Sequence, residues 1–168
     1  MTSPATLYAE IELTQNQVAK VSFWRFEELN RFPWSARWSK RTRSYYALRS
    51  GKTAEGYRYT VLMHRQILGL GYGDPRQGDH KNHDTLDNTD DNLQVASPAE
   101  NSYNRRKHCT SNNPYKGVSF HKATGKWQAQ IQVHGKKIFL GIFETAELAY
   151  AAYCKAAEQY FGAFACVG

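Results

Sequence analysis

The feature that most constrains the fold is a two-residue alternation that recurs in three segments between residues 118 and 142. The second and third segments are joined by His134-Gly135, a dipeptide typical of a tight turn. Because successive side chains of a strand point to opposite faces, the pattern predicts a three-stranded antiparallel sheet with one apolar face. The apolar set is Val118, Phe120, Trp127, Ala129, Ile131, Val133, Ile138, Leu140 and Ile142.

A helix is predicted immediately after this sheet. Thr145 is suited to cap its first turn, and Gly162 is suited to end it. Residues at helical spacing can cover the apolar face of the sheet. They are Ala149, Ala152, Tyr153, Ala156 and Tyr160.

Four segments of this region resemble the Apetala/ethylene-response-factor DNA-binding domain of plants. They are Tyr115-Lys116-Gly117-Val118, Gly125-Lys126-Trp127-Gln128-Ala129, Leu140-Gly141-Ile142-Phe143 and Glu147-Leu148-Ala149-Tyr150-Ala151-Ala152-Tyr153. The resemblance covers about residues 113–165 and implies that the polar face of the sheet contacts the major groove of DNA.

The candidate DNA contacts on this region contain no arginine. The bidentate contact between arginine and guanine is therefore missing, and glutamines could read adenine instead. The alternative is that the glutamines form only a solvated sheet face. The candidates are Lys116, Ser119, His121, Lys126, Gln128, Gln130, Gln132, Lys137 and Phe139.

A second informative stretch spans residues 78–104. It begins with a carboxylate beside a histidine, Asp79-His80, and continues through a polar loop to a short apolar strand entered at Asn92. Ser97-Pro98-Ala99-Glu100 is a capping box, so Asn101 lies in the first turn of a helix. The stretch therefore predicts a strand, a loop, a strand and a helix that gather four polar side chains.

These residues resemble an HNH endonuclease of the phage and intron homing type, which has a ββα-metal nuclease site. The resemblance covers about residues 11–104. It implies that His80 is the general base and that Asp79 and Asn101 hold one divalent cation, Mg²⁺ or Mn²⁺. Asn92 would hold either the His80 imidazole or the loop by hydrogen bonding.

The loop departs from that family at His83, which stands where these loops often have glycine. His83 is a rival for the role of base or an extra metal ligand. Asp84, Asp87 and Asn88 are expected to shape the loop through Asx turns rather than to bind metal.

The distribution of charge favours a polyanionic partner. The net charge is +7, and no acid occurs in residues 29–54 or 101–143, which hold seven and eight bases. Residues 105–113 read as a basic linker that can follow a DNA groove or be simply solvated. Arg105, Arg106 and Lys107 are its candidate DNA contacts.

Together these patterns predict an α+β protein. A small β-rich HNH ββα-metal nuclease domain spans 1–104, a basic linker 105–113, and a DNA-binding domain of three antiparallel strands packed on one helix 114–168. The predicted function is a metal-dependent endonuclease that hydrolyses double-stranded DNA at specific sites, as a homing enzyme does. The alternative is a catalytically inactive, DNA-binding transcriptional regulator, and a structural RNA-binding protein is a third possibility.

Further expectations concern the redox state of the cysteines, the cellular location and the oligomeric state. Cys109, Cys154 and Cys166 form no CxxC pair, so reduced thiols and a cytoplasmic location are expected, in the host cell if a phage encodes the chain. No stretch is long and apolar enough for a membrane span. Monomer and homodimer both stay open.

Overall fold

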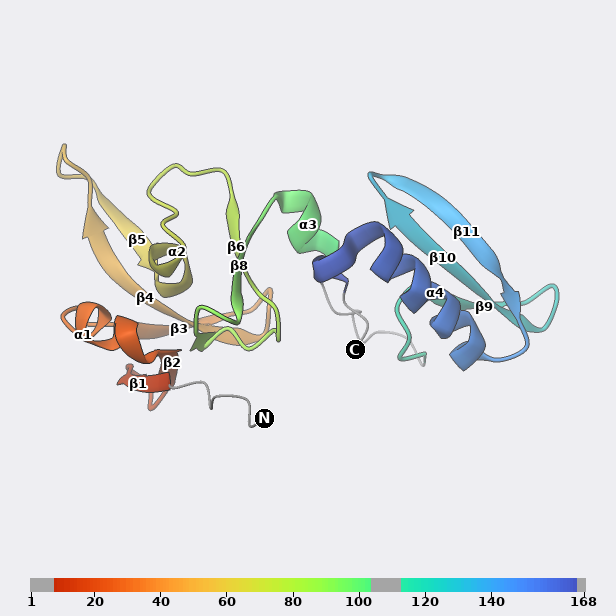
Figure 1. The fold of residues 1–168 in the computed structure, drawn as a ribbon, viewed down its shortest axis with the longest axis horizontal. Helices are drawn as coiled ribbons and strands as arrows, with labels where there is room; N and C mark the ends of the chain where they lie inside the picture. Colours follow the sequence, from red (N-terminus) through yellow and green to blue (C-terminus); the bar gives the residue numbers. More distant parts are fainter. Residues whose placement is uncertain (1–7, 104–112, 166–168) are drawn as a thin grey trace, which may run out of the picture. The chain divides into compact units, whose positions relative to one another are not determined.

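The computed structural model describes residues 8–103 and 113–165. The chain divides into two units, Met1–Ser97 and Pro98–Gly168 (Figure 1). The mixed α+β class with small, mostly antiparallel sheets is confirmed. The HNH-type arrangement is not shown, because the helix expected to complete it belongs to the second unit.

The described part of the first unit contains three small sheets. One has the order β1-β2-β7, with strands Tyr8–Glu12, Val18–Ser22 and Asp87–Asn88. The second has the order β3-β4-β5, with strands Ser35–Ser39, Ser44–Lys52 and Arg58–Leu62. The third pairs β6 (Gln77–His80) with β8 (Leu93–Ala96). Short helical segments connect them: η1 (Phe23–Arg25), α1 (Phe26–Leu29) and α2 (Met63–Ile67).

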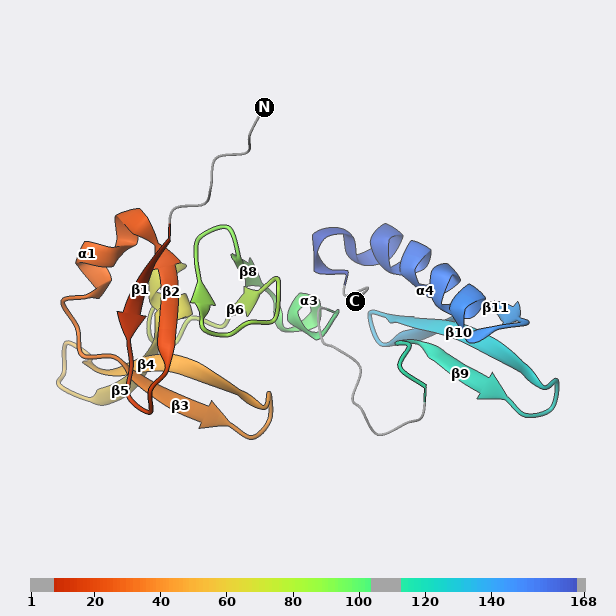
Figure 2. The same ribbon diagram turned by 90° about the horizontal axis from the view of Figure 1, so that it is seen from below.

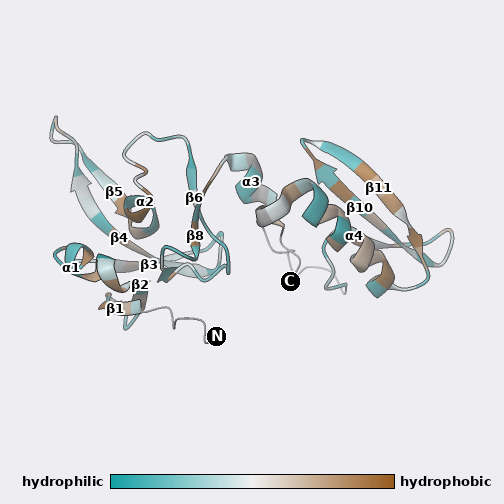
Figure 3. Cartoon of the chain, in the orientation of Figure 1, coloured by the Kyte–Doolittle hydropathy of each residue, from teal (hydrophilic) through white to brown (hydrophobic). Residues whose placement is uncertain are grey.

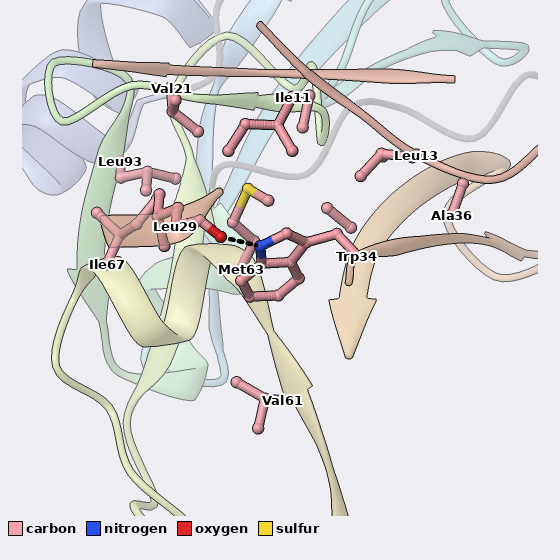
Figure 4. Packing of buried hydrophobic residues seen from close by; sticks show 12 residues of the cluster. Ile11, Leu13, Val21, Leu29, Trp34, Ala36, Val61, Met63, Ile67 and Leu93 are labelled. Atoms are coloured by element: carbon pink, nitrogen blue, oxygen red, sulfur yellow. Dashed lines mark hydrogen bonds between the residues drawn. The ribbon is translucent and has the colours of Figure 1, made fainter. Parts of the chain in front are cut away.

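One apolar cluster holds the sheets and helices of the first unit together (Figure 4). Met63 of α2 is fully buried and shares this cluster with Leu29 of α1 and Leu93 of β8. The Trp34 indole Nε1 donates a hydrogen bond of 2.8 Å to the carbonyl of Leu29. Burying each large apolar side chain contributes about 1.5–3 kcal/mol. The cluster thereby fixes β8, which follows the polar loop after β6, and α2, which contacts β6 and β7.

The second unit is a sheet covered by one helix. Its sheet has the order β11-β10-β9 and is antiparallel, and α4 lies along one face (Figures 1 and 2). Hydrophilic and hydrophobic residues both occur along β10 and β11 (Figure 3). The elements are α3 (Pro98–Tyr103), β9 (Val118–His121), β10 (Lys126–Val133), β11 (Lys136–Phe143), α4 (Ala146–Phe161) and η2 (Gly162–Phe164).

The expected start and end of α4 are confirmed. The Thr145 side chain accepts a hydrogen bond of 3.3 Å from the backbone N–H of Leu148. Gly162 follows the helix with φ 51°, a left-handed conformation that glycine adopts without cost. These two residues fix the length of the helix that covers the sheet.

Close packing between sheet and helix depends on Gly117. A Cβ at this position would lie 2.2 Å from Cδ2 of Tyr153 in α4, and the backbone has φ 72°. The Gly117 carbonyl also accepts a hydrogen bond of 2.8 Å from the backbone N–H of Gln130. Only glycine allows the chain to enter the sheet so close to the helix.

The predicted alternation is wrong at the end of β11. Gln130 pairs with Phe139, whereas Ala129 pairs with Gly141, so Leu140 is an extra residue on this strand. Such a β-bulge shifts the following side chains to the other face. Ile142 was expected on the apolar face, but it is 41% exposed, and Phe143 packs against the buried cluster instead.

The predicted domain limits stay a prediction. They place residues up to 104 in the first domain, and the division of the chain by contacts assigns α3 (Pro98–Tyr103) to the second unit. The predicted linker lies outside the described residues, apart from Asn113. Of the helices that the structure describes, none has the length and apolar character needed to cross a membrane.

Candidate nucleic-acid interface

Most of the predicted DNA contacts of the second unit occupy one face of its sheet. They face each other across the strands in the pairs Ser119↔Gln128, His121↔Lys126, Gln130↔Phe139 and Gln132↔Lys137. This outer face is opposite the one covered by α4, where Ala129 and Ile131 are buried. The sheet therefore presents an ordered row of polar groups on a rigid support.

The glutamine amides of the outer face differ in their partners. Nε2 of Gln128 donates a hydrogen bond of 3.0 Å to the hydroxyl of Ser119. Nε2 of Gln132 donates one of 3.3 Å to the carbonyl of Gly135. The Gln130 amide has no hydrogen-bond partner within the described residues. Gln130 can therefore offer both its donor and its acceptor to a ligand.

The charged groups of this region are only partly available. Nζ of Lys126 lies 2.5 Å from Oε1 of Glu144 in an exposed ion pair, which contributes little stability and can exchange for another anion. Nζ of Lys116 donates a hydrogen bond of 2.6 Å to the carbonyl of Tyr103, which engages this amine inside the unit. Lys137 is exposed on the outer face. It is the best placed of the three for a phosphate.

The outer face also carries apolar groups, one of which sequence reasoning missed. Phe139 is 63% exposed and Ile142 is 41% exposed. Ile142 stands directly opposite Gln128, next to the glutamine row. The signal that could have found it is Gly141, because a glycine inside a strand pattern marks a bulge. The remaining predicted contacts, Arg105, Arg106 and Lys107, lie outside the described residues.

The polar residues of the HNH-like stretch are largely buried in the first unit. Asp79, His80 and Asn92 are 8%, 5% and 7% exposed. Asp79 and His80 end β6, where they pair with Gln94 and Leu93 of β8. Oδ2 of Asp79 accepts a hydrogen bond of 2.9 Å from Nε2 of Gln94. One carboxylate oxygen is thus engaged by the sheet itself.

His80 is packed among other rings. Its imidazole lies 4.9 Å from that of His64 and 6.3 Å from the ring of Tyr46, measured between centroids. Its Nε2 lies 3.4 Å from Oδ1 of Asn88. Burial lowers the pKa of His80, and burial also lowers the pKa of His64, to about 3. Both imidazoles are therefore neutral near pH 7, and both rings are buried in the first unit.

Asn92 holds the loop rather than the imidazole. Its Oδ1 accepts a hydrogen bond of 3.0 Å from the backbone N–H of Asn82. Its Nδ2 donates one of 2.7 Å to the carbonyl of Asp87. Of the two roles left open for Asn92, the hydrogen bonds of the structure match this one.

The loop geometry explains several other residues. His83 has φ 65°, so the position where glycine was expected adopts the left-handed conformation. Oδ1 of Asp84 accepts from the N–H of Leu86, and Oδ1 of Asp87 accepts from the hydroxyl of Thr89 at 2.7 Å. The expectation that both aspartates shape the loop is confirmed. Asn88 contributes through its Nδ2, which donates to the carbonyl of Leu86.

The predicted cation site stays a prediction. Asn101 lies in α3 of the second unit, whereas Asp79 lies in the first. Within residues 8–103 and 113–165, no group of three or more His, Cys, Asp or Glu side chains is arranged to hold a metal ion.

Comparisons with known proteins match one region of the chain. Over 58 residues it is 40% identical to the AP2-like ethylene-responsive transcription factor TOE2 of Arabidopsis thaliana, which is 34% of this chain and 12% of that protein. APETALA2-like protein 2 of Oryza sativa subsp. indica and of subsp. japonica match equally, over 13% of their length. The similarity supports an AP2-type DNA-binding domain. No family model matches the chain, which spans only a small part of the length of these relatives.

These comparisons contradict the prediction of a metal-dependent DNA endonuclease. The Arabidopsis relative is named a transcription factor, and no comparison supports an HNH enzyme, a hydrolase or a phage origin. They favour the alternative, a DNA-binding regulator. The physical reason for the error is that the motif residues also have structural tasks. His80 packs in the core, and Asn92 hydrogen-bonds to the backbone of the loop. The HNH-like pattern of residues by itself therefore does not require catalysis.

Proposed function

We propose that this protein is a sequence-selective DNA-binding transcriptional regulator that contacts double-stranded DNA through the outer face of β9, β10 and β11. The observation that carries the proposal is the cross-strand row Ser119↔Gln128 and Gln130↔Phe139, which lies opposite the face that α4 buries. The similarity to AP2-like proteins supports the same reading.

The side chains on the outer face of the sheet are suited to contact A·T base pairs. A glutamine amide donates and accepts at once, which matches the N7 acceptor and N6 donor of adenine in the major groove. Phe139 and Ile142 offer apolar surface to the C5-methyl group of thymine. The sheet carries no arginine that could bind guanine in the bidentate manner.

Electrostatic attraction to the phosphates would supply affinity for DNA, whereas the polar side chains of the outer face would supply selectivity for the base sequence. Residues 101–143 contain no acid, so a phosphate backbone meets no like charge from this segment. Lys136 and Lys137 are exposed at the start of β11, where they can contact phosphates on either side of the groove.

The test is selection of the full chain on a random duplex library, followed by sequencing of the bound DNA. We expect enrichment of a motif that contains A·T pairs. Gln130→Ala should lose the preference at one position of the motif, whereas Leu148→Ala, on the exposed side of α4, should keep it. Failure to enrich any sequence would overturn the proposal.

A further inference from the structure

The first unit carries a basic β-hairpin that the proposed function does not use. It comprises β3, the part of β4 that pairs with it, and their turn, which together are residues 35–48. In Figure 2 the turn that joins the two strands lies at the periphery of this unit. The hairpin contains four bases and no acid. The bases are Arg37, Lys40, Arg41 and Arg43, and all are exposed.

The turn of this hairpin has a defined conformation. The backbone N–H of Arg43 donates to the carbonyl of Ser39 at 2.8 Å, and the hydroxyl of Ser44 donates to that of Thr42 at 3.0 Å. Arg43 has φ 53°, a left-handed conformation that costs an L-residue about 1–2 kcal/mol. The hydrogen bonds hold this conformation, so the bases are presented from a fixed backbone.

The body of the hairpin is anchored in the core. Ala36 pairs with Ala47, and these residues are 5% and 2% exposed. The next pair on the same face is Trp38↔Tyr45, whose rings lie 5.0 Å apart. The hydroxyl of Thr85 donates a hydrogen bond to the carbonyl of Tyr45. Trp38 is nevertheless 49% exposed. The hairpin is therefore a stiff ribbon with an aromatic side chain at its surface.

The charges of the ribbon are not neutralised by acids. In the described part of the chain, none of the four bases forms an ion pair. Arg25 and Arg76, in the same unit, do pair with Asp90 and Asp74. Four uncompensated positive charges on one rigid element favour a polyanion as its partner.

We propose that the β3–β4 hairpin is a second contact with duplex DNA, separate from the sheet of the second unit. A two-stranded ribbon fits the major groove, which is roughly 12 Å wide in B-form DNA. The deep and narrow major groove of duplex RNA does not admit side chains in this way. This hairpin proposal depends on the proposed function in one respect only, namely that the ligand is DNA.

Two contacts on one chain change the energetics of binding. Once one unit is bound, the other meets the DNA at a high effective concentration, and the overall affinity exceeds that of either contact alone. The hairpin would thereby lengthen the site and steepen the salt dependence, because each neutralised phosphate releases counterions.

The experiment compares two triple variants of the full chain. The first carries Lys40→Ala, Arg41→Ala and Arg43→Gly, where glycine suits the positive φ. The control carries Arg31→Ala, Lys52→Ala and Arg58→Ala, which removes the same formal charge from exposed positions outside residues 35–48. Dissociation constants for a selected duplex are measured by fluorescence anisotropy between 50 and 200 mM salt, after thermal unfolding has shown that both variants are folded.

We expect the hairpin variant to bind at least about tenfold more weakly and its salt slope to fall by about 2–3. The control variant should keep a dissociation constant and a salt slope close to those of the parent chain. Equal behaviour of the two variants would overturn the hairpin proposal, as would an equally large loss on duplex RNA. A parent chain that binds no duplex DNA would instead overturn the proposed function, so the two failures are distinguishable.

Discussion

Gln128 of β10 lies directly opposite Ile142 of β11, because the bulge at Leu140 turns Ile142 from the apolar face to the outer face of the sheet. A hydrogen-bonding amide and a branched apolar side chain are thus neighbours on one rigid surface. This relationship makes the methyl group of thymine a testable ligand.

Replacing thymine by deoxyuridine in the selected site should weaken binding by the parent chain. Loss of one buried methyl group costs about 0.8 kcal/mol, or about fourfold in the dissociation constant. Ile142→Ala should reduce this difference between the two duplexes, whereas Leu148→Ala should leave it unchanged. Identical discrimination in the parent and in Ile142→Ala would remove Ile142 from the interface.

Gly117→Ala should destabilise the second unit by more than Gly125→Ala. Both glycines have positive φ, 72° and 68°, but only at Gly117 would the added Cβ clash with Tyr153. The left-handed strain of about 1–2 kcal/mol is common to both, and overpacking adds about 1–3 kcal/mol at Gly117. Urea unfolding curves of the two variants give the comparison. A smaller loss for Gly117→Ala than for Gly125→Ala would contradict the close packing of Gly117 against Tyr153.

The stability of the protein should fall as the pH is lowered below about 6.5. The folded-state pKa of His64, about 3, is below its ordinary value of 6.5 because the ring is buried. Below pH 6.5 the unfolded chain binds more protons than the folded one, so stability is lost as the pH falls toward the folded-state pKa. The loss at pH 3 is of order 4 kcal/mol.

His64→Phe should flatten this dependence, as measured by denaturant unfolding at pH 7, 5 and 4. His134→Asn, on an exposed turn with φ 47°, should retain the slope of the parent. A slope that survives in His64→Phe would assign the acid sensitivity to other groups.

Asn92→Asp should destabilise the first unit. The carboxylate keeps an acceptor for the N–H of Asn82, but it loses the donor to the carbonyl of Asp87 and adds a charge at a site only 7% exposed. Such a loss costs about 1–3 kcal/mol or more. Asp91→Asn, at the exposed neighbouring position, should be nearly neutral. Calorimetry that shows equal unfolding temperatures for the two variants would refute this role of Asn92.

Sequence reasoning succeeded where the structure depends on local rules. The three strands and the helix of the second unit follow from a period of two residues, from the cap at Thr145 and from the stop at Gly162. The turn-forming roles of Asp84 and Asp87 are equally local. The position of the bulge was missed, because its local signal was the single glycine Gly141 and alternation within one strand does not reveal the register with the next.

The interpretation of the HNH-like stretch failed for a different reason. The neighbours of His80 are Tyr46 and His64, which lie 34 and 16 residues earlier in the sequence. The spacing of residues within 78–104 therefore gives no indication that His80 is buried. A buried structural histidine and a solvent-accessible catalytic histidine are the same residue type in a sequence. Only the tertiary packing distinguishes them.

The bulge has a further consequence, for association between copies of the chain. In the described sheet β11 is an edge strand of eight residues, whose free backbone groups could accept a strand from another molecule. Leu140 and Gly141 interrupt the regular spacing of those groups, and Lys136 and Lys137 add positive charge where the edge begins. An irregular, charged edge is a poor template for strand addition, so we expect the distortion that shapes the outer face also to limit pairing between copies of the chain.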